Sequence, residues 1–350
     1  MTMPFINDVI SSNKEQLEKN SITAKRQSRF IFEPESVLNR LHQAIVGQDH
    51  ILSTLGGLLH VIKADITDKS RPLAVCFFAG STGVGKTQTA KLLASSLTGQ
   101  SDGLCRIDMG TLSQEHYSAS ITGAPPGYVG SKEENTLFDI DKIQGSYSRP
   151  GVVLFDEVEK ASKAVQRALL NIMDSGFLRL AAGKKNIDFT NSIIIFTSNL
   201  GAKKTQAVEE RHQSGWRKAF KITYSNKKRV DLVTQEIKKH FDPEFINRID
   251  YLQVFNSLDD ATLPKILDVV LEKLKARLAK KSIDLNVDMK TKQYLLSAYN
   301  PQYGARDIIR RVRTEMEPSI AKAMNTYQDV SQFSTATLNG RITVGPCNNT

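Results

Sequence analysis

Runs of apolar residues and stretches of helical periodicity alternate along the first two thirds of the chain. Three runs are continuously apolar, as expected for strands that are buried on both faces of a parallel sheet: residues 72–80, 151–157 and 191–199. Between the runs, apolar residues recur at helical spacing, for example in residues 163–176, where Gly176 is suited to end a helix. Because strands alternate with helices, we expect an α/β sandwich with a mostly parallel sheet.

The pattern divides the chain into three parts. Residues 1–36 are polar and of mixed charge, and we interpret them as a loosely ordered tail or a short adaptor helix. Residues 37–255 carry the α/β pattern, which begins with two helical segments that the sequence AIVGQ separates. Residues 256–350 predict a smaller, mainly helical domain that closes with a hairpin or edge strand, and its first long helix starts at the acids Asp259 and Asp260.

The sequence GSTGVGKT directly follows the first apolar run and opens the next predicted helix. It fits the phosphate-binding pattern G-x-x-x-x-G-K-[ST], and a strand before it and a helix after it are the context that this motif requires. Its glycines let backbone N–H groups surround a phosphate, and the helix N-terminus adds positive potential. We expect Lys86 to reach the β- and γ-phosphates of ATP and the Thr87 hydroxyl to hold Mg²⁺. The nucleotide-binding residues of the motif are therefore Gly80, Ser81, Thr82, Gly83, Val84, Gly85, Lys86 and Thr87.

Polar side chains end the other two apolar runs. Asp156 and Glu157 end the second run, where two acids are costly unless they meet a cation or water. Asp156 suits the Mg²⁺ shell, and Glu157 suits a base that polarises the attacking water. Asn199 ends the third run, at the carboxyl edge of the sheet where α/β proteins bind ligands, and its amide can orient that water. The sequence thus predicts a site for ATP hydrolysis.

Composition argues against a membrane protein, a secreted protein and a disulfide-rich protein. The chain is 40% hydrophobic and 24% charged, as globular proteins are, and no apolar run approaches the roughly 18 residues that span a bilayer. The N-terminus lacks the basic start and apolar stretch of a secretory signal. The three cysteines, Cys76, Cys105 and Cys347, are too scattered for a disulfide framework or a metal site. We therefore expect a cytoplasmic protein that does not enter a membrane.

The net charge of +10 raises the question of whether the protein binds nucleic acid. Residues 201–230 hold nine Lys and Arg against two Glu, so one segment carries most of the basic surplus. With Trp216 and Tyr224 interleaved, this segment could bind a partner or nucleic acid. A solvated loop and helix would give the same composition, and we favour that interpretation.

Eight motifs in order make the chain resemble a Clp-type AAA+ ATPase, and in particular the second ATPase module of the ClpB disaggregase family. They are AIVGQ, GSTGVGKT, RIDMG, GAPPGYVG, VVLFDEVEKA, IIIFTSNLGA, FDPEFINRID and YGARDIIRRV. The resemblance runs from about residue 38 to residue 345 and implies an AAA+ P-loop NTPase domain followed by a small helical lid domain. It also implies ATP and Mg²⁺ as cofactors, a homo-hexameric ring, and ATP hydrolysis coupled to protein unfolding.

The resemblance assigns further roles residue by residue. Arg248 of FINRID matches the arginine finger, which reaches the γ-phosphate bound by the neighbouring subunit, and such fingers accelerate hydrolysis by ~10³–10⁵-fold. Arg306 of YGARD matches the sensor of the small domain, which contacts nucleotide and couples it to lid motion. Ile45 and Val46 of AIVGQ match the adenine pocket.

The sequence GYVG matches the central pore loop of the family. Tyr128 and Val129 lie in SITGAPPGYVGS, where five of twelve residues are Gly or Pro, so a helix interior or central strand is not expected. A tyrosine that covers a small satellite core would also fit this stretch. The resemblance favours a loop in which Tyr128 and Val129 grip a client polypeptide during threading.

The chain also departs from the ClpB pattern. We find no first ATPase module, coiled-coil arm or globular N-terminal domain in this sequence, and we therefore expect a narrower client than that of ClpB. An adaptor that binds through the N-terminal tail is a further expectation. Two other functions remain open: an AAA+ motor or loader that acts on nucleic acid, and a nucleotide-gated assembly scaffold. An aromatic, apolar pore loop argues against the first, since a loop that grips DNA should be basic. The presence of all the hydrolytic residues argues against the second.

Overall fold

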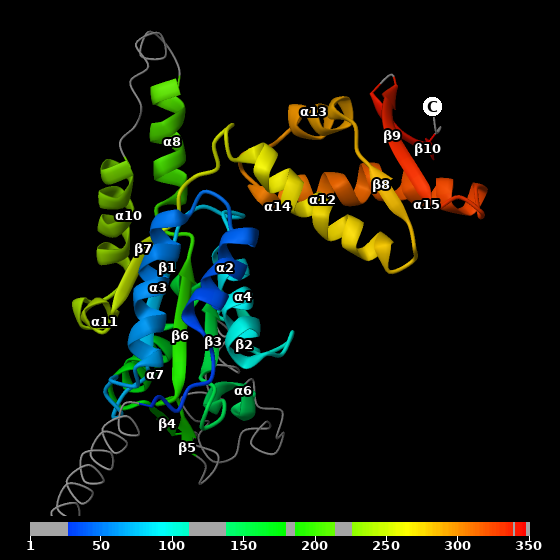
Figure 1. Ribbon diagram of the computed structural model, residues 1–350. Helices are drawn as coiled ribbons and strands as arrows, with labels where there is room; N and C mark the ends of the chain where they lie inside the picture. The colour runs from blue at the N-terminus through cyan, green and yellow to red at the C-terminus, as the bar shows by residue number, and fades with distance from the viewer. Residues whose placement is uncertain (1–26, 112–137, 180–185, 214–225, 339, 348–350) are drawn as a thin grey trace, which may run out of the picture.

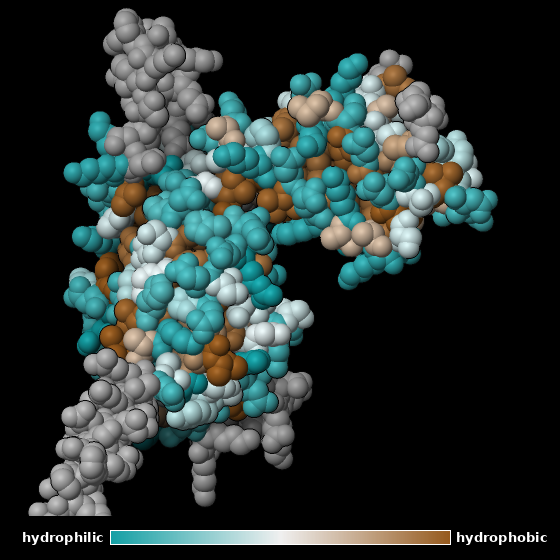
Figure 2. Space-filling model, viewed as in Figure 1, coloured by the Kyte–Doolittle hydropathy of each residue, from teal (hydrophilic) through white to brown (hydrophobic). Residues whose placement is uncertain are grey.

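The computed structural model describes residues 27–111, 138–179, 186–213, 226–338 and 340–347. It consists of a large domain built around a sheet and a small domain set to one side of it (Figure 1). Hydrophilic residues cover most of the visible face of both domains, and apolar residues appear there only in small groups (Figure 2). Among the described residues, none of the helices is both long and apolar enough to cross a membrane.

Five parallel strands form the sheet of the large domain, in the order β2-β3-β6-β1-β7. Their bounds are β1 (Ala74–Ala79), β2 (Leu104–Asp108), β3 (Gly151–Asp156), β6 (Ser192–Ser198) and β7 (Tyr251–Val254). The three central strands, β3, β6 and β1, are buried along their whole length, as continuous apolar runs require. The predicted α/β fold with a parallel sheet is confirmed, and the carboxyl ends of these strands meet at one edge.

Helices cover both faces of this sheet (Figure 1). One face packs against α2 (Pro34–Ala44), α3 (Asp49–Lys63) and α4 (Lys86–Thr98). The other face packs against α6 (Ile140–Gln144), α7 (Lys163–Ser175), α10 (Asn226–His240) and α11 (Pro243–Asn247), together with the hairpin of β4 (Phe177–Arg179) and β5 (Asn186–Asp188). As predicted, α7 ends at Gly176, whose φ of 70° is left-handed.

The large domain begins earlier in the chain than the sequence pattern indicates. Phe30 and Phe32, which the pattern assigns to a polar tail, are 2% and 6% exposed and share a core with α2 and α3. Lys63 of α3 holds them there, because its ammonium donates to the carbonyl oxygens of Phe30 and Phe32 at 3.0 and 2.8 Å. The tail interpretation is therefore wrong for residues 27–36, and residues 1–26 lie outside the described part of the chain.

The described parts of the basic segment, residues 201–213 and 226–230, lie mainly on two neighbouring helices. α8 (Ala202–Gln213) and α10 lie side by side, and Lys204 of α8 forms an ion pair with Glu236 of α10 at 2.8 Å. α10 also contributes Val233 and Ile237, just beyond the basic segment, to the large-domain core, so the end of the segment lies on a helix that packs against the sheet. Trp216 and Tyr224 lie outside the described residues.

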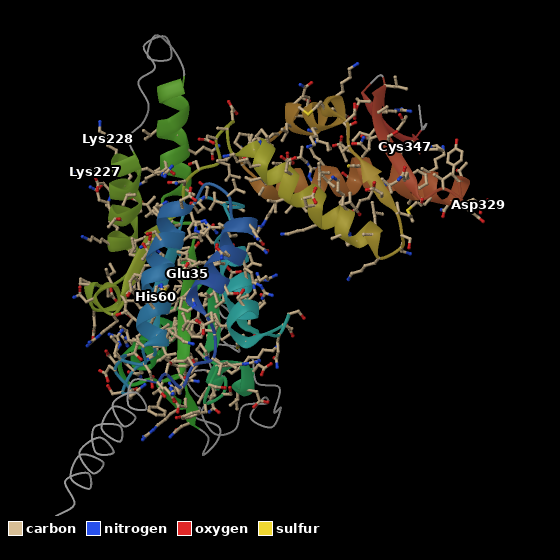
Figure 3. All side chains as sticks on the ribbon, in the orientation of Figure 1. Glu35, His60, Lys227, Lys228, Asp329 and Cys347 are labelled. Atoms are coloured by element: carbon tan, nitrogen blue, oxygen red, sulfur yellow. The ribbon has the colours of Figure 1, made fainter. Side chains whose placement is uncertain are left out.

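The small domain has a core of its own, built from helices and a three-stranded sheet. Its elements are α12 (Leu263–Ala279), β8 (Asp284–Asn286), α13 (Met289–Ser297), α14 (Ala305–Arg311), the π-helical turn Val312–Met316, α15 (Glu317–Thr326), β9 (Gln332–Leu338) and β10 (Arg341–Pro346). β9 and β10 pair antiparallel, which confirms the predicted hairpin. Asp329 and Cys347 lie at the end of this domain that is remote from the large one (Figure 3).

The first long helix of the small domain begins later than its acids predict. α12 starts at Leu263, after Thr262 as its N-cap residue. The carboxylate of Asp259 accepts a hydrogen bond from the backbone N–H of Thr262 at 2.9 Å, so it stabilises the turn that precedes the helix. Asp260 is exposed in the same turn. The expectation that both acids cap the helix directly was therefore wrong.

The two domains meet at the phosphate-binding loop. The backbone N–H of Ala305 in α14 donates to the carbonyl oxygen of Gly83 at 3.0 Å. The two backbone segments are so close that a Cβ atom on Gly83 would lie 2.2 Å from the carbonyl oxygen of Tyr303. Nearby, the buried side chain of Gln48 exchanges two hydrogen bonds with the backbone of Asn256, at 3.1 and 2.8 Å, and so anchors the segment that links the domains.

Candidate nucleotide-binding site

A pocket of about 450 Å³ opens where the small domain meets the carboxyl edge of the large sheet. Its walls come from the loop between α2 and α3, the phosphate-binding loop, the ends of β3 and β6, and helices α12 and α14. Most residues predicted to act in the site line this one pocket: Ile45, Val46, residues 82–87, Asp156, Glu157, Asn199 and Arg306. The fold thus brings together residues that are separated by up to about 260 positions.

The phosphate-binding loop has the backbone shape that an anion requires. Gly80, Gly83 and Gly85 have φ of 141°, 77° and 113°, which residues with a side chain rarely adopt. Gly85 is the N-cap residue of α4 and offers no side chain to the first N–H groups of the helix. These donors, with the positive end of the helix dipole, are suited to a phosphate.

Lys86 is the first residue of α4 and is only 7% exposed. Its ammonium donates to the carbonyl oxygens of Gly80 and Ser81 at 2.6 and 2.8 Å, and to Oδ1 of Asn199 at 2.9 Å. Burial lowers the pKa of Lys86 to about 8, because desolvation disfavours the charged form, although nearby carboxylates, above all that of Glu159, oppose the shift. Gly80 and Ser81 do not line the pocket themselves. Their carbonyl oxygens instead hold the Lys86 side chain in place.

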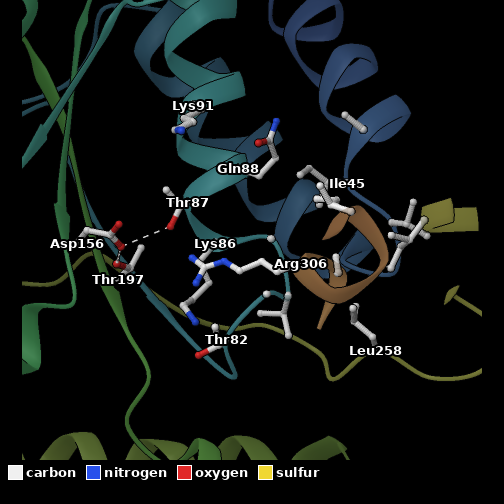
Figure 4. A pocket seen from close by; sticks show the side chains of 18 of the residues that line it. Ile45, Thr82, Lys86, Thr87, Gln88, Lys91, Asp156, Thr197, Leu258 and Arg306 are labelled. Atoms are coloured by element: carbon white, nitrogen blue, oxygen red, sulfur yellow. Dashed lines mark hydrogen bonds between the residues drawn. The ribbon is translucent and has the colours of Figure 1, made fainter. Parts of the chain in front are cut away.

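Asp156 ends β3, and its side chain is 9% exposed. Its Oδ2 atom accepts hydrogen bonds from Nε and Nη2 of Arg106 at 3.0 and 2.7 Å. Its Oδ1 atom accepts one from the Thr197 hydroxyl and one from the Thr87 hydroxyl, the latter at 3.4 Å (Figure 4). The two oxygens predicted to hold Mg²⁺, those of Thr87 and Asp156, therefore lie next to each other.

Glu157 has a strained backbone and a directed carboxylate. Its φ of 59° is left-handed, a conformation that costs a residue other than glycine ~1–3 kcal/mol. Its N–H donates to the Thr197 hydroxyl at 3.0 Å, which holds the turn after β3. Its carboxylate accepts from Nδ2 of Asn199 at 3.2 Å and forms an ion pair with Lys160, which raises the pKa of Lys160. Strain that the surrounding contacts maintain is typical of an active-site residue.

Side chains from both domains complete the pocket. Arg306 extends from α14 into the pocket beside Lys86 (Figure 4), and its charge contributes to the lowered pKa of Lys86. Ile45 and Val46 form an apolar wall together with Leu258 of the linking segment. An apolar wall on one side and a cationic loop on the other match the two ends of a nucleotide, its base and its phosphates.

Among the predicted site residues that the structure describes, Arg248 lies away from this pocket. Arg248 follows α11, is 47% exposed, and forms an ion pair with Asp174 of α7 at 2.6 Å. An arginine that acts on a neighbouring copy does not need to reach the pocket of its own chain, so this position leaves the hypothesis untested. Tyr128 and Val129 lie outside the described residues.

Four other side chains contribute to the site without having been identified from the sequence: Arg106, Glu159, Lys160 and Thr197. Glu159 supports Asn199, whose backbone N–H donates to its carboxylate at 2.9 Å. Strand alternation is the signal that could have found Thr197, since it lies two residues before Asn199 on the same face of the chain. Arg106 lies in the family motif RIDMG, but nothing local to it identifies Asp156 as its partner.

Two known families match the chain. Residues 71–252, just over half of the chain, match the family described as AAA domain (Cdc48 subfamily). Residues 258–335 match the C-terminal, D2-small domain, of ClpB protein. The second match falls on the small domain whose α14 carries Arg306.

Relatives and solved structures agree with these families. The chain is 38% identical over 341 residues to the ATP-dependent protease ATP-binding subunit-like protein AmiB of Pseudomonas aeruginosa, a match that covers 91% of this chain and 92% of the relative. It is 35% identical over 291 residues to chaperone protein ClpC1, chloroplastic, of Arabidopsis thaliana, covering 81% of this chain but 30% of the relative. A closed-state structure of Hsp104 with ATPγS and FITC-casein superposes with a TM-score of 0.72 at 27% identity, covering 89% of this chain and 51% of the other.

The family that the eight motifs indicate is therefore confirmed, and so is the arrangement of an AAA+ domain followed by a small helical domain. None of these matches supports a nucleic-acid motor. The chain belongs to the AAA+ ATPases of the Clp and ClpB type, enzymes in which ATP hydrolysis drives the remodelling of other proteins.

Proposed function

We propose that this protein is a single-ring unfoldase that threads a client polypeptide through a central pore. The observation that carries the proposal is the direct contact between the two domains at the phosphate-binding loop, where the Ala305 N–H donates to the Gly83 carbonyl at 3.0 Å. Because the pocket is lined by both domains, a change at bound phosphates would alter the packing of the small domain. Chemical change in the pocket is thereby converted into domain motion.

The pocket fits Mg²⁺ bound together with a nucleotide. The Thr87 hydroxyl and the Asp156 carboxylate would hold the metal, since both are oxygen ligands and lie 3.4 Å apart. Among the described residues, no group of three or more His, Cys, Asp and Glu side chains could hold a metal ion. Such a metal would therefore depend on phosphate oxygens and water for the rest of its shell, and it would supply charge neutralisation at those phosphates.

The pocket residues of this chain then have separate roles in binding and hydrolysing ATP. Glu157 accepts a proton from the attacking water, and the Asn199 amide, which donates to Glu157 at 3.2 Å, holds the carboxylate and orients the water. Lys86 and Arg306 neutralise the phosphates from the two domains. Ile45 and Val46 pack against the adenine.

A homo-hexameric ring would place Arg248 of one copy at the pocket of the next. Its guanidinium is half exposed and is held in place by Asp174, so it is available at the surface of the large domain. In the assembled ring Arg248 would stabilise the charge that develops on the phosphates. Tyr128 and Val129 would face the pore and contact the client, and residues of the N-terminal tail would bind an adaptor.

A cytoplasmic location completes this proposal. Cys76, Cys105 and Cys347 are all free, which is consistent with a reducing compartment. The Hsp104 structure that resembles this chain was determined with casein, which favours a protein client for this chain too. The remaining alternative, a nucleotide-gated assembly scaffold that threads no client, is disfavoured because the hydrolytic residues are assembled in one pocket. Hydrogen bonds, some of them through Thr197, connect Lys86, Asp156, Glu157 and Asn199 there.

The test is ATP-dependent capture of an unfolded polypeptide. A Glu157→Gln variant should retain ATP, and fluorescence anisotropy should then show tight binding of FITC-casein with ATP and weak binding with ADP. Lys86→Ala is the matched control, since it should bind FITC-casein weakly with either nucleotide. Equal binding by the two variants, or binding that ignores the nucleotide, would contradict the proposal.

A further inference from the structure

Arg106 lies on β2, an edge strand of the sheet, two residues before Asp108. Strand register pairs Asp108 with Asp156, which makes Arg106 the diagonal neighbour of Asp156 on the same face. A long side chain can reach across that diagonal, and the Arg106 guanidinium does so, while its side chain remains 45% exposed. Arg106 therefore lines the pocket and also contacts Asp156.

The carboxylate of Asp156 has no acceptor capacity left. A carboxylate offers about four lone-pair sites. Two on Oδ2 are taken by Nε and Nη2 of Arg106, and two on Oδ1 are taken by the hydroxyls of Thr197 and Thr87. A metal ion that binds this carboxylate must therefore displace a donor or share an oxygen with one.

Of these donors, Arg106 is the one that opposes a metal. Thr197 is 1% exposed, and its hydroxyl also accepts the Glu157 N–H at 3.0 Å, so it is fixed from two sides. Thr87 is itself a proposed metal ligand. Arg106 is charged, is half exposed, and can turn toward water when its partner is taken.

We propose that Arg106 competes with Mg²⁺ for Asp156 and so sets how strongly nucleotide binding depends on the metal. The guanidinium compensates the buried carboxylate, which would otherwise be an unpaired charge. The same contact weakens the site for a divalent cation, because the cation must compete with a positive charge that is already on the carboxylate. This inference rests on the proposed magnesium role of Thr87 and Asp156.

The test is the coupling between Mg²⁺ and ADP, measured as the ratio of the ADP dissociation constants in EDTA and in excess Mg²⁺ by isothermal titration calorimetry. Arg106→Gln should raise this ratio at least about fivefold over the wild type, because the metal no longer meets a competing charge. Lys91→Gln is the matched control: it also removes one positive charge from the pocket wall, but Lys91 is not among the donors to Asp156. It should weaken ADP binding about equally in both conditions.

Arg106→Lys supplies a second variant if the glutamine variant does not fold. It retains the charge and loses the two-donor contact, so its ratio should lie between those of the wild type and Arg106→Gln. A ratio that is unchanged or lower in either variant would overturn the competition, and a lower ratio would show that Arg106 supports metal binding instead. A ratio near one in the wild type and in Arg106→Gln alike would instead refute the proposed magnesium site itself, whereas an unchanged ratio well above one would refute only the competition.

Discussion

The buried Lys86 ammonium makes nucleotide binding depend on pH. Its pKa in the folded chain is about 8, against the ordinary 10.5, because burial disfavours the charge. Between these pH values the unfolded chain binds a proton that the folded chain does not, so folding stability rises with pH across this window. Below pH 8, keeping the charge buried costs about 3 kcal/mol, which follows from the size of the shift.

A bound phosphate favours the charged lysine, so ADP binding should be accompanied by proton uptake. With a pKa of about 8, uptake should be ~0.1 proton at pH 7, ~0.5 at pH 8 and ~0.9 at pH 9, and the affinity should fall about tenfold from pH 7 to pH 9. Calorimetric titrations in two buffers that differ in ionisation enthalpy measure this uptake directly. They also report the affinity at each pH.

Lys86→Arg is the control for this experiment, since arginine stays charged throughout the range. The variant is allowed to bind ADP more weakly overall, but residue 86 should no longer make its affinity depend on pH. The proton uptake that the wild type shows at pH 9 should also disappear. A wild-type protein that takes up no proton at pH 9, with an affinity that does not change from pH 7, would refute the reasoning that burial controls this lysine.

Three further predictions concern the base, the shared site and the domain contact. Glu157→Gln should keep ATP bound while hydrolysis falls by at least ~10²-fold in a single-turnover assay, and normal turnover would exclude Glu157 as the base. Mixing Arg248→Ala with Glu157→Gln subunits should restore part of the ATPase activity if Arg248 acts on its neighbour; mixed rings without recovery would contradict that role. Gly83→Ala would bring a Cβ atom to 2.2 Å from the Tyr303 carbonyl and should weaken ADP binding at least ~10-fold in a calorimetric titration. Gly57→Ala, where nothing lies within 4 Å, should bind ADP like the wild type, and equal affinities for both variants would count against the domain contact.

The sheet and the phosphate-binding loop could be predicted because local sequence determines them. β1, β3 and β6 are buried on both faces, so their sequences are continuously apolar. The loop that contains Lys86 must combine glycines, a cation and a hydroxyl at fixed spacing, and few other structures require that combination. Asp156 and Asn199 could be placed at the same edge because parallel strands end together.

The contacts that could not be predicted join distant parts of the chain. Arg106 and Asp156 are 50 residues apart, and only strand register places them on one diagonal. Phe30 and Phe32 lie among polar residues with no sustained period, so their burial depends on a partner, Lys63, that the local pattern does not reveal. Such pairs follow from tertiary packing, which sequence periodicity does not report.

The measurement that tests the central claim most directly is the ATPase rate with and without an unfolded polypeptide. Unfolded casein should stimulate the wild type, and Tyr128→Ala should keep the basal rate while losing that stimulation. Tyr128→Phe should retain it, because packing needs the aromatic ring and not the hydroxyl. If casein leaves the wild-type rate unchanged while single-stranded DNA raises it, or if Tyr128→Ala responds to casein like the wild type, the threading account is contradicted.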